Sequence, residues 1–390
     1  MNNEPLAGIR ILDFSWIIAG PTAARHLALM GAQVIKIGSS RRLDPSTGGP
    51  PFQIYNQSKE HCALNIATPE GVEIAKELIA VSDVLIENFA AGVIDKMGLG
   101  YEVVKSIKPD IIMLSSAGTG HSGPDRDFVA YGSLLQHYTG WNSISGEPES
   151  GPLKGGIWAD PWVGMELSMI TLAALNRRIK TGQGGYIDYS MAESLTSAIG
   201  PSLVGFQMSG SPPVPNGNQD LFIFPHGIFP CKGEEDWIAI SIETIDQWIA
   251  LCRVIGRRDW ETNENLFDTK VREQFSDEIN DAISNWTRGV SDFQAMETLQ
   301  NNGISAAPSL SLEQVESDNH LHASGYLYDQ EFSDGNVRAM PTLPWTINGR
   351  RTDNLYPAKA IGESDEYVYE NILGVSEDEF SQFKKRNIIY

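Results

Sequence analysis

Residues 8–37 read GIRILDFSWIIAGPTAARHLALMGAQVIKI, and this stretch decides the fold. The apolar run from Gly8 to Phe14 predicts a buried strand, and Thr22 to Met30 has the apolar spacing of a helix. A second buried strand is predicted from Ala32 to Ile37. Because a strand, a helix and a strand in this order form a β-α-β unit, we predict a parallel sheet with helices on its faces.

The alternation of strands and helices continues outward from this unit. Further strands are predicted at 84–86, 110–115 and 186–190, and helices at 69–81, 93–97, 102–107 and 161–179. Beyond a stretch rich in Pro, Gly and Asn at 212–218, strands are expected at 227–229 and 237–242, with helices at 246–254 and 293–301. We therefore predict an α/β fold with a Rossmann-like parallel sheet in a large domain and a smaller α+β domain. The segments are the N-terminal part of the large domain (1–205), a linker (206–225), the small domain (226–325) and a C-terminal return to the large domain (326–390).

The charge balance excludes one class of partner. Fifty Asp and Glu residues outnumber 29 Lys and Arg residues, which gives a formal net charge of −21. A nucleic-acid partner requires a basic face, so we expect none. No run approaches the roughly 18 apolar residues that cross a bilayer, and the N-terminus lacks a secretory signal. We therefore expect no membrane partner and a cytoplasmic location.

Individual residues bear on ligands more directly than the net charge does. A phosphorylated cofactor needs only a few local cations, and each candidate can equally be a solvated surface charge. The candidates are Lys36, Arg41, Arg42, Lys59 and Lys96. Cys62, Cys231 and Cys252 share no metal-type spacing, so we assign them packing roles as reduced thiols.

Three familiar kinds of site lack support. The stretch Gly118-Thr119-Gly120-His121-Ser122-Gly123 matches a dinucleotide fingerprint, but Pro124 to Asp127 follow where a helix should begin, so we expect neither NAD nor FAD. The histidines are scattered, and only His320 and His322 lie close together, in a stretch that reads as a loop, so we expect no metal. A serine hydrolase of the elbow type would need Gly-x-Ser-x-Gly, which the sequence lacks.

Asp160 lies in the stretch Gly155-Gly156-Ile157-Trp158-Ala159-Asp160-Pro161, at the start of the predicted long helix. An aspartate followed by a proline is typical of a helix N-cap with the proline at the first helical position. The residues alone therefore predict a structural role for Asp160 and leave a catalytic role open.

Short motifs occur in a fixed order along nearly the whole chain. They are Pro5 to Gly8, Ala19 to Pro21, Leu29 to Lys36, Leu64, Thr68 to Gly71, Asp83-Val84, Glu87 to Phe89, Met97 to Tyr101, Ser122 to Pro124, Thr181 to Gly184 and Gly303 to Pro308. In order and spacing they resemble the class III coenzyme A transferases, the family that includes formyl-CoA transferase, carnitine CoA-transferase and the α-methylacyl-CoA racemases.

The resemblance implies a reaction and a nucleophile. In that family the nucleophilic aspartate lies just ahead of the long helix with a glycine four residues behind it, the places of Asp160 and Gly164 here. The implied reaction is of the EC 2.8.3 type and moves CoA from a donor acyl-CoA to an acceptor carboxylic acid, through an aspartyl anhydride and an aspartyl-CoA thioester. The dipole of a helix favours the ionised form of a carboxylate at its start, which suits a nucleophile.

The resemblance also implies the binding partners. Coenzyme A is expected as a thioester substrate and product, without a metal, and two copies of the chain are expected to form an interlocked homodimer. Water must be kept from the reactive intermediates, and apolar residues near the motifs are hypothesised to exclude it. These are Trp16, Ile17, Ile18, Trp158 and Trp162. The residues expected to contact coenzyme A are Ile18, Ala19, Arg41, Leu64, Asn88, Phe89, Lys96, Met97 and Tyr131.

The sequence departs from formyl-CoA transferase in ways that bear on the substrate. Ile18 replaces a glutamine of that enzyme, Gly38 stands where the family has an acidic residue, and residues 219–227 replace its glycine-rich loop. These departures argue against formyl or oxalyl substrates.

Three alternatives stay open. A racemase would use a histidine as a second base, but Tyr131 occupies that position. A CoA-binding subunit of a heteromeric transferase and a generic CoA-binding module are the others, and neither would need Asp160.

Overall fold

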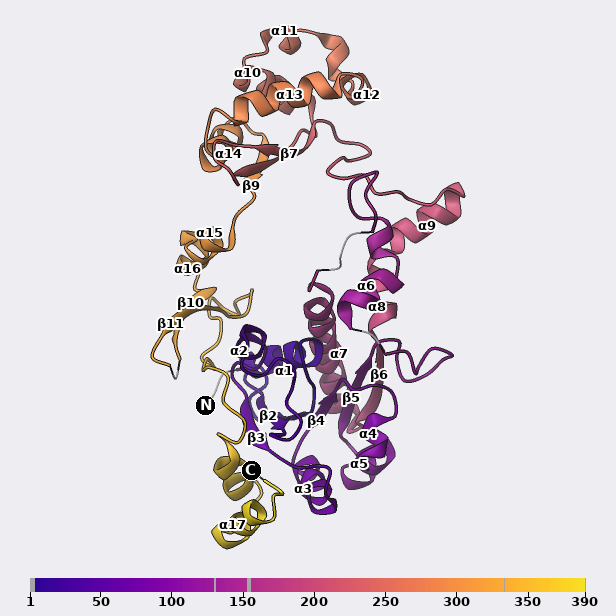
Figure 1. Cartoon of the computed structure of the whole chain (residues 1–390), viewed down its shortest axis with the longest axis vertical. Coiled ribbons are helices and arrows are strands. Elements are labelled where there is room, and N and C mark those ends of the chain that lie inside the picture. Colours follow the sequence, from indigo (N-terminus) through magenta and orange to yellow (C-terminus); the bar gives the residue numbers. More distant parts are fainter. Residues whose placement is uncertain (1–3, 130, 153–155, 333, 390) are drawn as a thin grey trace. The chain divides into compact units, whose positions relative to one another are not determined.

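The structure is a computed structural model, and it describes residues 4–129, 131–152, 156–332 and 334–389 (Figure 1). The chain divides into two compact units. The first comprises Met1–Asn142, Lys154–Ser211 and His320–Tyr390, and the second comprises Ser143–Leu153 and Pro212–Asn319. Each unit is therefore built from stretches that lie far apart in the sequence.

A parallel sheet, six-stranded in the described part of the chain, forms the centre of the first unit. Its strands lie in the order β3-β2-β1-β4-β5-β6. They are β1 Arg10–Asp13, β2 Gln33–Gly38, β3 Glu60–Ala63, β4 Val84–Glu87, β5 Ile112–Ala117 and β6 Gly185–Ser190. The predicted α/β fold with a parallel sheet is confirmed. The strand order reverses between β1 and β4, and ligands of such sheets bind at the carboxyl ends of the strands near this reversal.

Helices cover both faces of this sheet (Figure 1). They include α1 Ala19–Leu29, α2 Pro50–Tyr55, α3 Pro69–Ala80, α4 Val93–Lys96, α5 Tyr101–Ile107, α6 Gly132–Tyr138, α7 Ala159–Thr181 and α8 Met191–Ala198. The helix α9 Gly200–Ser209 follows α8 and has no buried residue. Successive side chains of a strand point to opposite faces. Ile11 and Val84 therefore pack in one core with α1 and α7, whereas Leu12 and Leu85 pack in another with α3.

The C-terminal part of the chain returns to the first unit. It contains α16 Asn319–Ala323, the antiparallel strands β10 Leu327–Glu331 and β11 Val337–Pro341, a helical turn at Tyr367–Ile372 and α17 Glu377–Lys385. The Tyr369 hydroxyl donates to the Ala63 carbonyl at 2.6 Å, and the Ala63 N–H donates to Asp365 at 2.8 Å. These bonds attach the segment to β3. His320 and His322 lie on α16, so the prediction that they occupy a loop is wrong.

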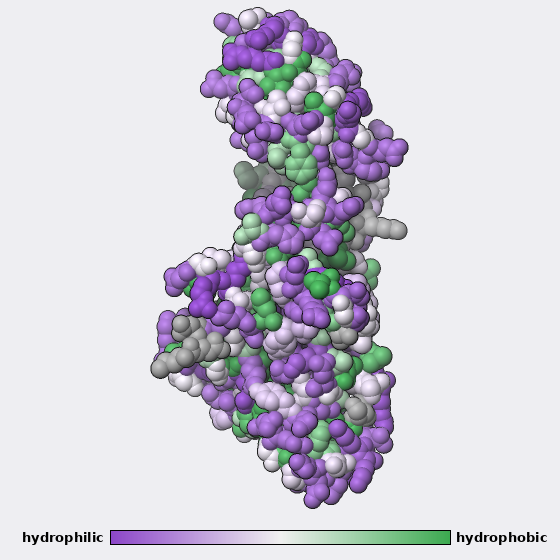
Figure 2. All heavy atoms as spheres, turned by 90° about the vertical axis from the view of Figure 1, so that its left-hand side faces the viewer, coloured by the Kyte–Doolittle hydropathy of each residue, from purple (hydrophilic) through white to green (hydrophobic). Residues whose placement is uncertain are grey.

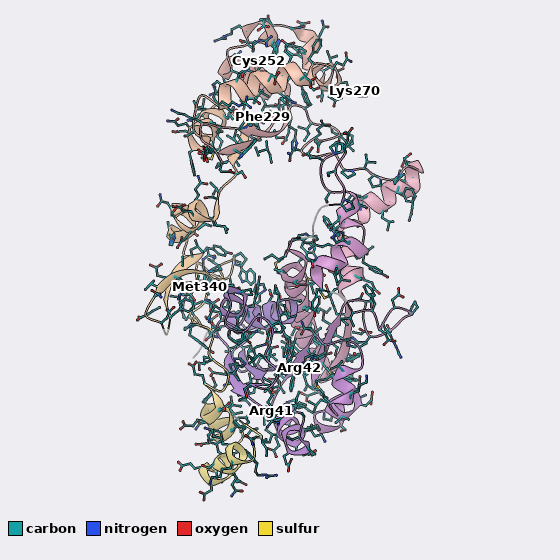
Figure 3. All side chains as sticks on the ribbon, viewed as in Figure 1. Arg41, Arg42, Phe229, Cys252, Lys270 and Met340 are labelled. Atoms are coloured by element: carbon teal, nitrogen blue, oxygen red, sulfur yellow. The ribbon has the colours of Figure 1, made fainter. Side chains whose placement is uncertain are left out.

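The second unit has its own antiparallel sheet and core. Its strands, in the order β7-β8-β9, are β7 His226–Pro230, β8 Trp237–Ser241 and β9 Ser305–Pro308. Its helices include α10 Ile245–Val254, α11 Arg258–Glu261, α12 Thr269–Glu273, α13 Ser276–Thr287, α14 Asp292–Asn301 and α15 Leu312–Glu316. Phe229 and Cys252 lie in its core (Figure 3). All three cysteines of the chain are free and buried, which confirms their packing role.

Candidate active site

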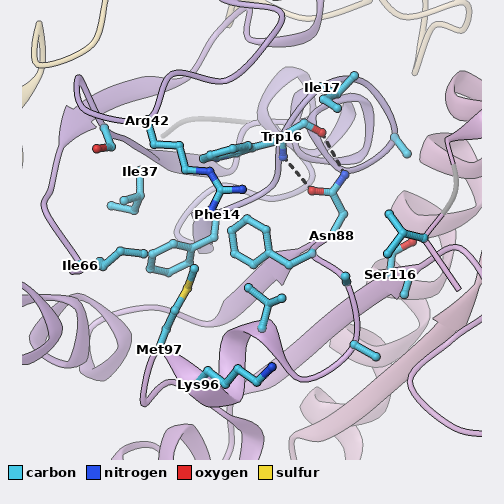
Figure 4. Close-up of a pocket in the computed structure, with 18 of the residues that line it drawn as sticks. Phe14, Trp16, Ile17, Ile37, Arg42, Ile66, Asn88, Lys96, Met97 and Ser116 are labelled. Carbon is cyan, nitrogen blue, oxygen red and sulfur yellow. Dashed lines mark hydrogen bonds between the residues drawn. The ribbon is translucent and has the colours of Figure 1, made fainter. Parts of the chain in front are cut away.

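The loop after β1 is held by side chains from two other segments. The Trp16 N–H donates to Oδ1 of Asn88 at 2.7 Å, and Nδ2 of Asn88 donates to the Trp16 carbonyl at 2.9 Å (Figure 4). The Ile17 N–H donates to Oδ2 of Asp44 at 3.1 Å. Ile17 has a φ of 67°, in the left-handed region that β-branched residues rarely adopt. Because strained residues persist only where their surroundings hold them, and cluster at functional sites, this loop is a candidate site.

A buried charge network lies beneath the loop. Asp13, at the end of β1, pairs with Lys59 at 2.9 Å, and Nζ of Lys36 donates to the Ser15 carbonyl at 2.7 Å. Burial alone would raise the pKa of Asp13, but the charges of Lys59 and Lys36 outweigh it and lower that pKa. Lys36 and Lys59 are both fully buried, which excludes the alternative that they are solvated surface charges, and neither is among the described lining residues of the cavity described next. They support the loop from beneath.

A cavity of about 830 Å³ lies at the carboxyl ends of the parallel strands. Its lining comes from the segments that end or directly follow β1 to β5, such as Phe14 after β1 and Ala117 at the end of β5. All nine residues expected to contact coenzyme A line this cavity, together with Asp160. They are Ile18, Ala19, Arg41, Leu64, Asn88, Phe89, Lys96, Met97 and Tyr131. The structure therefore brings the sequence-predicted residues to one place.

The lining of the cavity combines apolar walls with cations. The Trp16 and Phe89 rings meet edge to face with centroids 5.9 Å apart. The guanidinium of Arg42 lies 5.1 Å from the Trp16 ring centroid, and both residues are labelled in Figure 4. Arg41 and Lys96 also line the cavity. A mainly apolar cavity with a few cations suits a ligand that has both an apolar part and phosphate groups.

Asp160 is the second residue of α7. The prediction that it caps this helix is wrong, because the N-cap position belongs to Trp158 and no side chain caps it. Burial raises the pKa of Asp160 to about 6. Loss of hydration therefore outweighs the helix N-terminus, which acts in the opposite direction. The carboxylate is mostly ionised at neutral pH, but it is more basic than an ordinary aspartate and so a better nucleophile.

Two glycines let other helices approach the start of α7. A Cβ atom on Gly132, in α6, would lie 2.2 Å from Oδ1 of Asp160. A Cβ atom on Gly164 would lie 2.5 Å from Cβ of Thr22 and 2.8 Å from the Ala19 carbonyl oxygen, both in α1. Such distances are too short for any larger residue. Gly164 was identified through the family resemblance, whereas Gly132 was missed although it directly follows Tyr131.

Arg126 was also missed. It lines the cavity and lies two positions after Pro124, the last residue of the motif from Ser122 to Pro124. Its distance from the other cations in the sequence concealed its place, because only the folded loop after β5 brings it to the cavity.

Of the five apolar residues hypothesised to exclude water, three line the cavity. Trp16, Ile17 and Ile18 line the cavity. Trp158 and Trp162 are not among its described lining residues, and each is 37% exposed. The Trp158 ring instead packs edge to face on Trp141, with centroids 4.6 Å apart.

Two further expectations concern membranes and metals. Within residues 4–129, 131–152, 156–332 and 334–389, no helix has both the length and the apolarity of a membrane span. Over the same ranges, no three His, Cys, Asp or Glu side chains gather as a metal site would require.

Known proteins offer a direct comparison. A family model described as CoA-transferase family III matches residues 6–364. The chain is 30% identical to a succinate–glutarate CoA-transferase from Agrobacterium fabrum, over 93% of this chain and 94% of the relative. It is also 30% identical to a succinyl-CoA–L-malate CoA-transferase beta subunit from Chloroflexus aurantiacus, over 99% and 98% of the two chains. The solved structure of a CAIB/BAIF family protein from Brucella suis matches with a TM-score of 0.87 at 25% identity, covering 95% of this chain and 100% of that one.

Proposed function

This chain belongs to CoA-transferase family III, and on that premise we propose a nucleophile, a reaction course and a class of exchanged acids for it. The protein is an enzyme of the EC 2.8.3 type, and its substrates are an acyl-CoA and a carboxylic acid. We propose which residues carry out the reaction and which acids are exchanged.

In the proposed reaction Asp160 carries the groups that are exchanged. Its carboxylate attacks the carbonyl carbon of the donor acyl-CoA, the C–S bond breaks, and CoA thiolate leaves behind an acyl-aspartyl anhydride. The thiolate then attacks the aspartyl carbonyl, which releases the donor acid as a carboxylate and leaves an aspartyl-CoA thioester. The acceptor carboxylate attacks this thioester and displaces the thiolate, which gives a second anhydride. Attack of the thiolate on the acyl carbonyl then releases the acceptor acyl-CoA and regenerates the Asp160 carboxylate.

One observation carries this proposal. Asp160 is a partly buried carboxylate, with its pKa raised to about 6, in the same cavity as the cations and aromatic rings described above. Arg41, Arg42 and Lys96 would meet the phosphates of coenzyme A, and the Trp16 and Phe89 rings would pack against its apolar parts. Binding energy from these remote contacts would hold the thioester beside Asp160.

We propose dicarboxylic acids of the size of succinate and glutarate, which are longer than oxalate, as the exchanged pair. The two relatives are named for succinate, glutarate, succinyl-CoA and L-malate. The departures at Ile18 and Gly38, which argue against formyl and oxalyl groups, agree with this class. A panel of succinyl-CoA with free dicarboxylic and monocarboxylic acids, read by mass spectrometry of the CoA products, identifies the preferred acceptor.

The racemase and heteromeric-transferase alternatives can each be tested from one specific observation. Tyr131 lines the cavity, where a racemase would need a histidine, so exchange of the α-proton of an acyl-CoA with solvent deuterium is expected to be undetectable.

The alternative of a heteromeric transferase is tested separately. One relative is named as a beta subunit, so the purified chain must be assayed alone. Transfer by this chain without any partner would exclude the need for a second subunit.

Replacement of Asp160 by alanine tests the nucleophile. We expect Asp160→Ala to lose CoA transfer by at least about a thousandfold while coenzyme A binding, measured by calorimetry, changes little. Hydroxylamine should trap a derivative on Asp160 in the wild-type protein incubated with acyl-CoA, and peptide mass spectrometry locates it. The control is Asp281→Asn, at an exposed position of α13, which should transfer CoA at the wild-type rate. Wild-type turnover by Asp160→Ala would rule out the assignment.

A further inference from the structure

Glu87, His121 and Asp188 form an acid–imidazole–acid triad, and Glu87 joins it to the backbone of Phe89 in the cavity lining. Glu87 ends β4, and its Oε2 accepts the Phe89 N–H at 2.8 Å. Its other oxygen, Oε1, lies 3.6 Å from Nε2 of His121. Nδ1 of His121 lies 3.1 Å from Oδ1 of Asp188, and the same oxygen accepts the His121 backbone N–H at 2.8 Å. The triad therefore joins the ends of β4 and β6 through the glycine-rich stretch after β5.

The contact between Glu87 and His121 brings two acceptor atoms together. Asp188 accepts hydrogen bonds, so Nδ1 of His121 carries a hydrogen, and Nε2 of the neutral ring is then an acceptor. Oε1 of an ionised Glu87 is also an acceptor. Both atoms are buried, and neither has a hydrogen-bond partner among the described residues. Two buried acceptors that face each other are unfavourable unless a proton lies between them.

Several titratable and hydrogen-bonding groups surround Glu87 and His121. Burial raises the pKa of Glu87, while the Ser115 hydroxyl, the Phe89 N–H and His121 oppose this and Asp95 reinforces it. His121 and Asp188 also line a second cavity of about 710 Å³. The other titratable residues lining that cavity are Asp95, Lys96, Tyr101, Glu102, Arg126, Asp127 and Tyr186.

We propose that Glu87 is a positioning residue for the acyl-CoA cavity and that the proton it shares with His121 makes coenzyme A affinity depend on pH. Glu87 holds the N–H of Phe89, whose ring packs against Trp16. Asn88, between them, holds the backbone of the Trp16 loop. Loss of the shared proton at high pH leaves two acceptors facing each other. Glu87 then turns away from the Phe89 N–H, and the part of the cavity lining formed by Phe89 and Trp16 is held less firmly. The inference rests on the proposed function, because it takes coenzyme A as the ligand of the cavity.

Two substitutions at Glu87 separate the proton from the shape of the side chain. In Glu87→Gln, the amide oxygen can accept the Phe89 N–H while the amide nitrogen donates to Nε2 of His121, which imitates the protonated pair. We expect wild-type affinity near neutral pH and no weakening at high pH. Glu87→Ala removes the bond to Phe89, so its dissociation constant should rise about tenfold at every pH, with kcat at saturation nearly unchanged.

Calorimetry with coenzyme A, from about pH 6 to about pH 9, measures these effects. Wild-type affinity should fall as pH rises, and His137→Gln, at an exposed histidine of α6, should follow the wild-type curve. Denaturant unfolding of each variant verifies that it is folded before its affinity is compared. Identical pH curves for wild type and Glu87→Gln, or equal weakening in both Glu87 variants, would overturn the shared proton. If the wild-type protein binds no coenzyme A, the proposed function fails, and this inference with it.

Discussion

At the scale of the residue, burial decides the chemistry of Asp160. A carboxylate in the first turn of a helix would ordinarily have a lowered pKa, but its place in the cavity raises the pKa to about 6. The residue must be ionised to attack a thioester. Its reactivity should therefore appear as pH rises through the folded-state pKa and disappear as pH falls through it.

This shift predicts an acid limb in the activity. The kcat/KM for acyl-CoA should be level above about pH 7 as far as Asp160 is concerned, and should fall about tenfold for each pH unit below about pH 6. Initial rates with a thioester that is stable over this range measure the profile. A profile that stays level down to about pH 4.5 would show that burial does not raise the pKa of Asp160 in solution.

Much of the cavity was predictable residue by residue, through motifs whose order matches a family. The residues alone assigned Asp160 only a cap, which the structure contradicts. The triad was out of reach because His121 and Asp188 lie 67 positions apart in the sequence, and His121 was embedded in a glycine pattern that suggested a different ligand. Burial of Lys36 and Lys59 was equally hidden, since a lysine next to apolar residues looks the same whether it is solvated or paired.

At the scale of the element, the close packing of α1 on α7 sets the position of the nucleophile. Every residue of α1 is buried, and the helix begins at Ala19, three residues before the predicted start at Thr22. A proline is tolerated in the first turn, which is why Pro21 did not delay the helix. Gly164 allows α7 to reach the backbone of α1. A larger residue there would push α7, and Asp160 with it, away from the loop after β1.

Gly164→Ala tests this packing. The added methyl would lie 2.8 Å from the Ala19 carbonyl oxygen, which cannot move without shifting the start of α1. We expect the free energy of unfolding, from denaturant titration, to fall by about 1–3 kcal/mol, with CoA transfer reduced more than coenzyme A binding. Gly151→Ala is the control, because Gly151 lies outside α1, α7 and α9 with nothing within 4 Å of its added methyl. That variant should be unchanged or more stable by up to about 1 kcal/mol. Equal stability of the two variants would contradict the close approach.

Elements with long apolar runs were predictable, and short polar ones were not. The missed strand β3 has only four residues, EHCA, of which the first two are polar. Glu60 is held by Lys359 and Ser364 from the far end of the chain, so the signal that makes it a strand is not local. The same holds for β10 and β11, which pair with each other but carry few apolar residues.

At the scale of the whole molecule, exposed apolar residues indicate a missing partner. None of the residues of α9 is buried, although Leu203, Val204, Phe206 and Met208 are apolar. Met165 and Met169 on α7 are exposed as well. By contrast, hydrophilic residues predominate on the face shown in Figure 2, where the hydrophobic ones form small separate patches. An apolar helix surface in water is unfavourable, so we propose that a second copy of the chain covers α7 and α9. The linker at 206–225 and the other predicted domain limits stay predictions.

The proposed homodimer makes a prediction that distinguishes interlocked rings from an ordinary interface. Light scattering after size exclusion should give twice the chain mass of 42.8 kDa. Rings that thread each other cannot separate while folded, so the mass should persist on dilution for as long as the chains stay folded, whereas an ordinary dimer would dissociate near its dissociation constant. Met169→Glu combined with Met208→Glu places charges at positions that are 64% and 84% exposed in the isolated chain, and should reduce the yield of dimer. The control is Leu312→Glu on α15, at an exposed position outside these two helices. A stable, active monomer of the wild-type protein would contradict the proposed dimer. Rapid dissociation of the dimer on dilution would contradict only the proposed interlocking of the two chains.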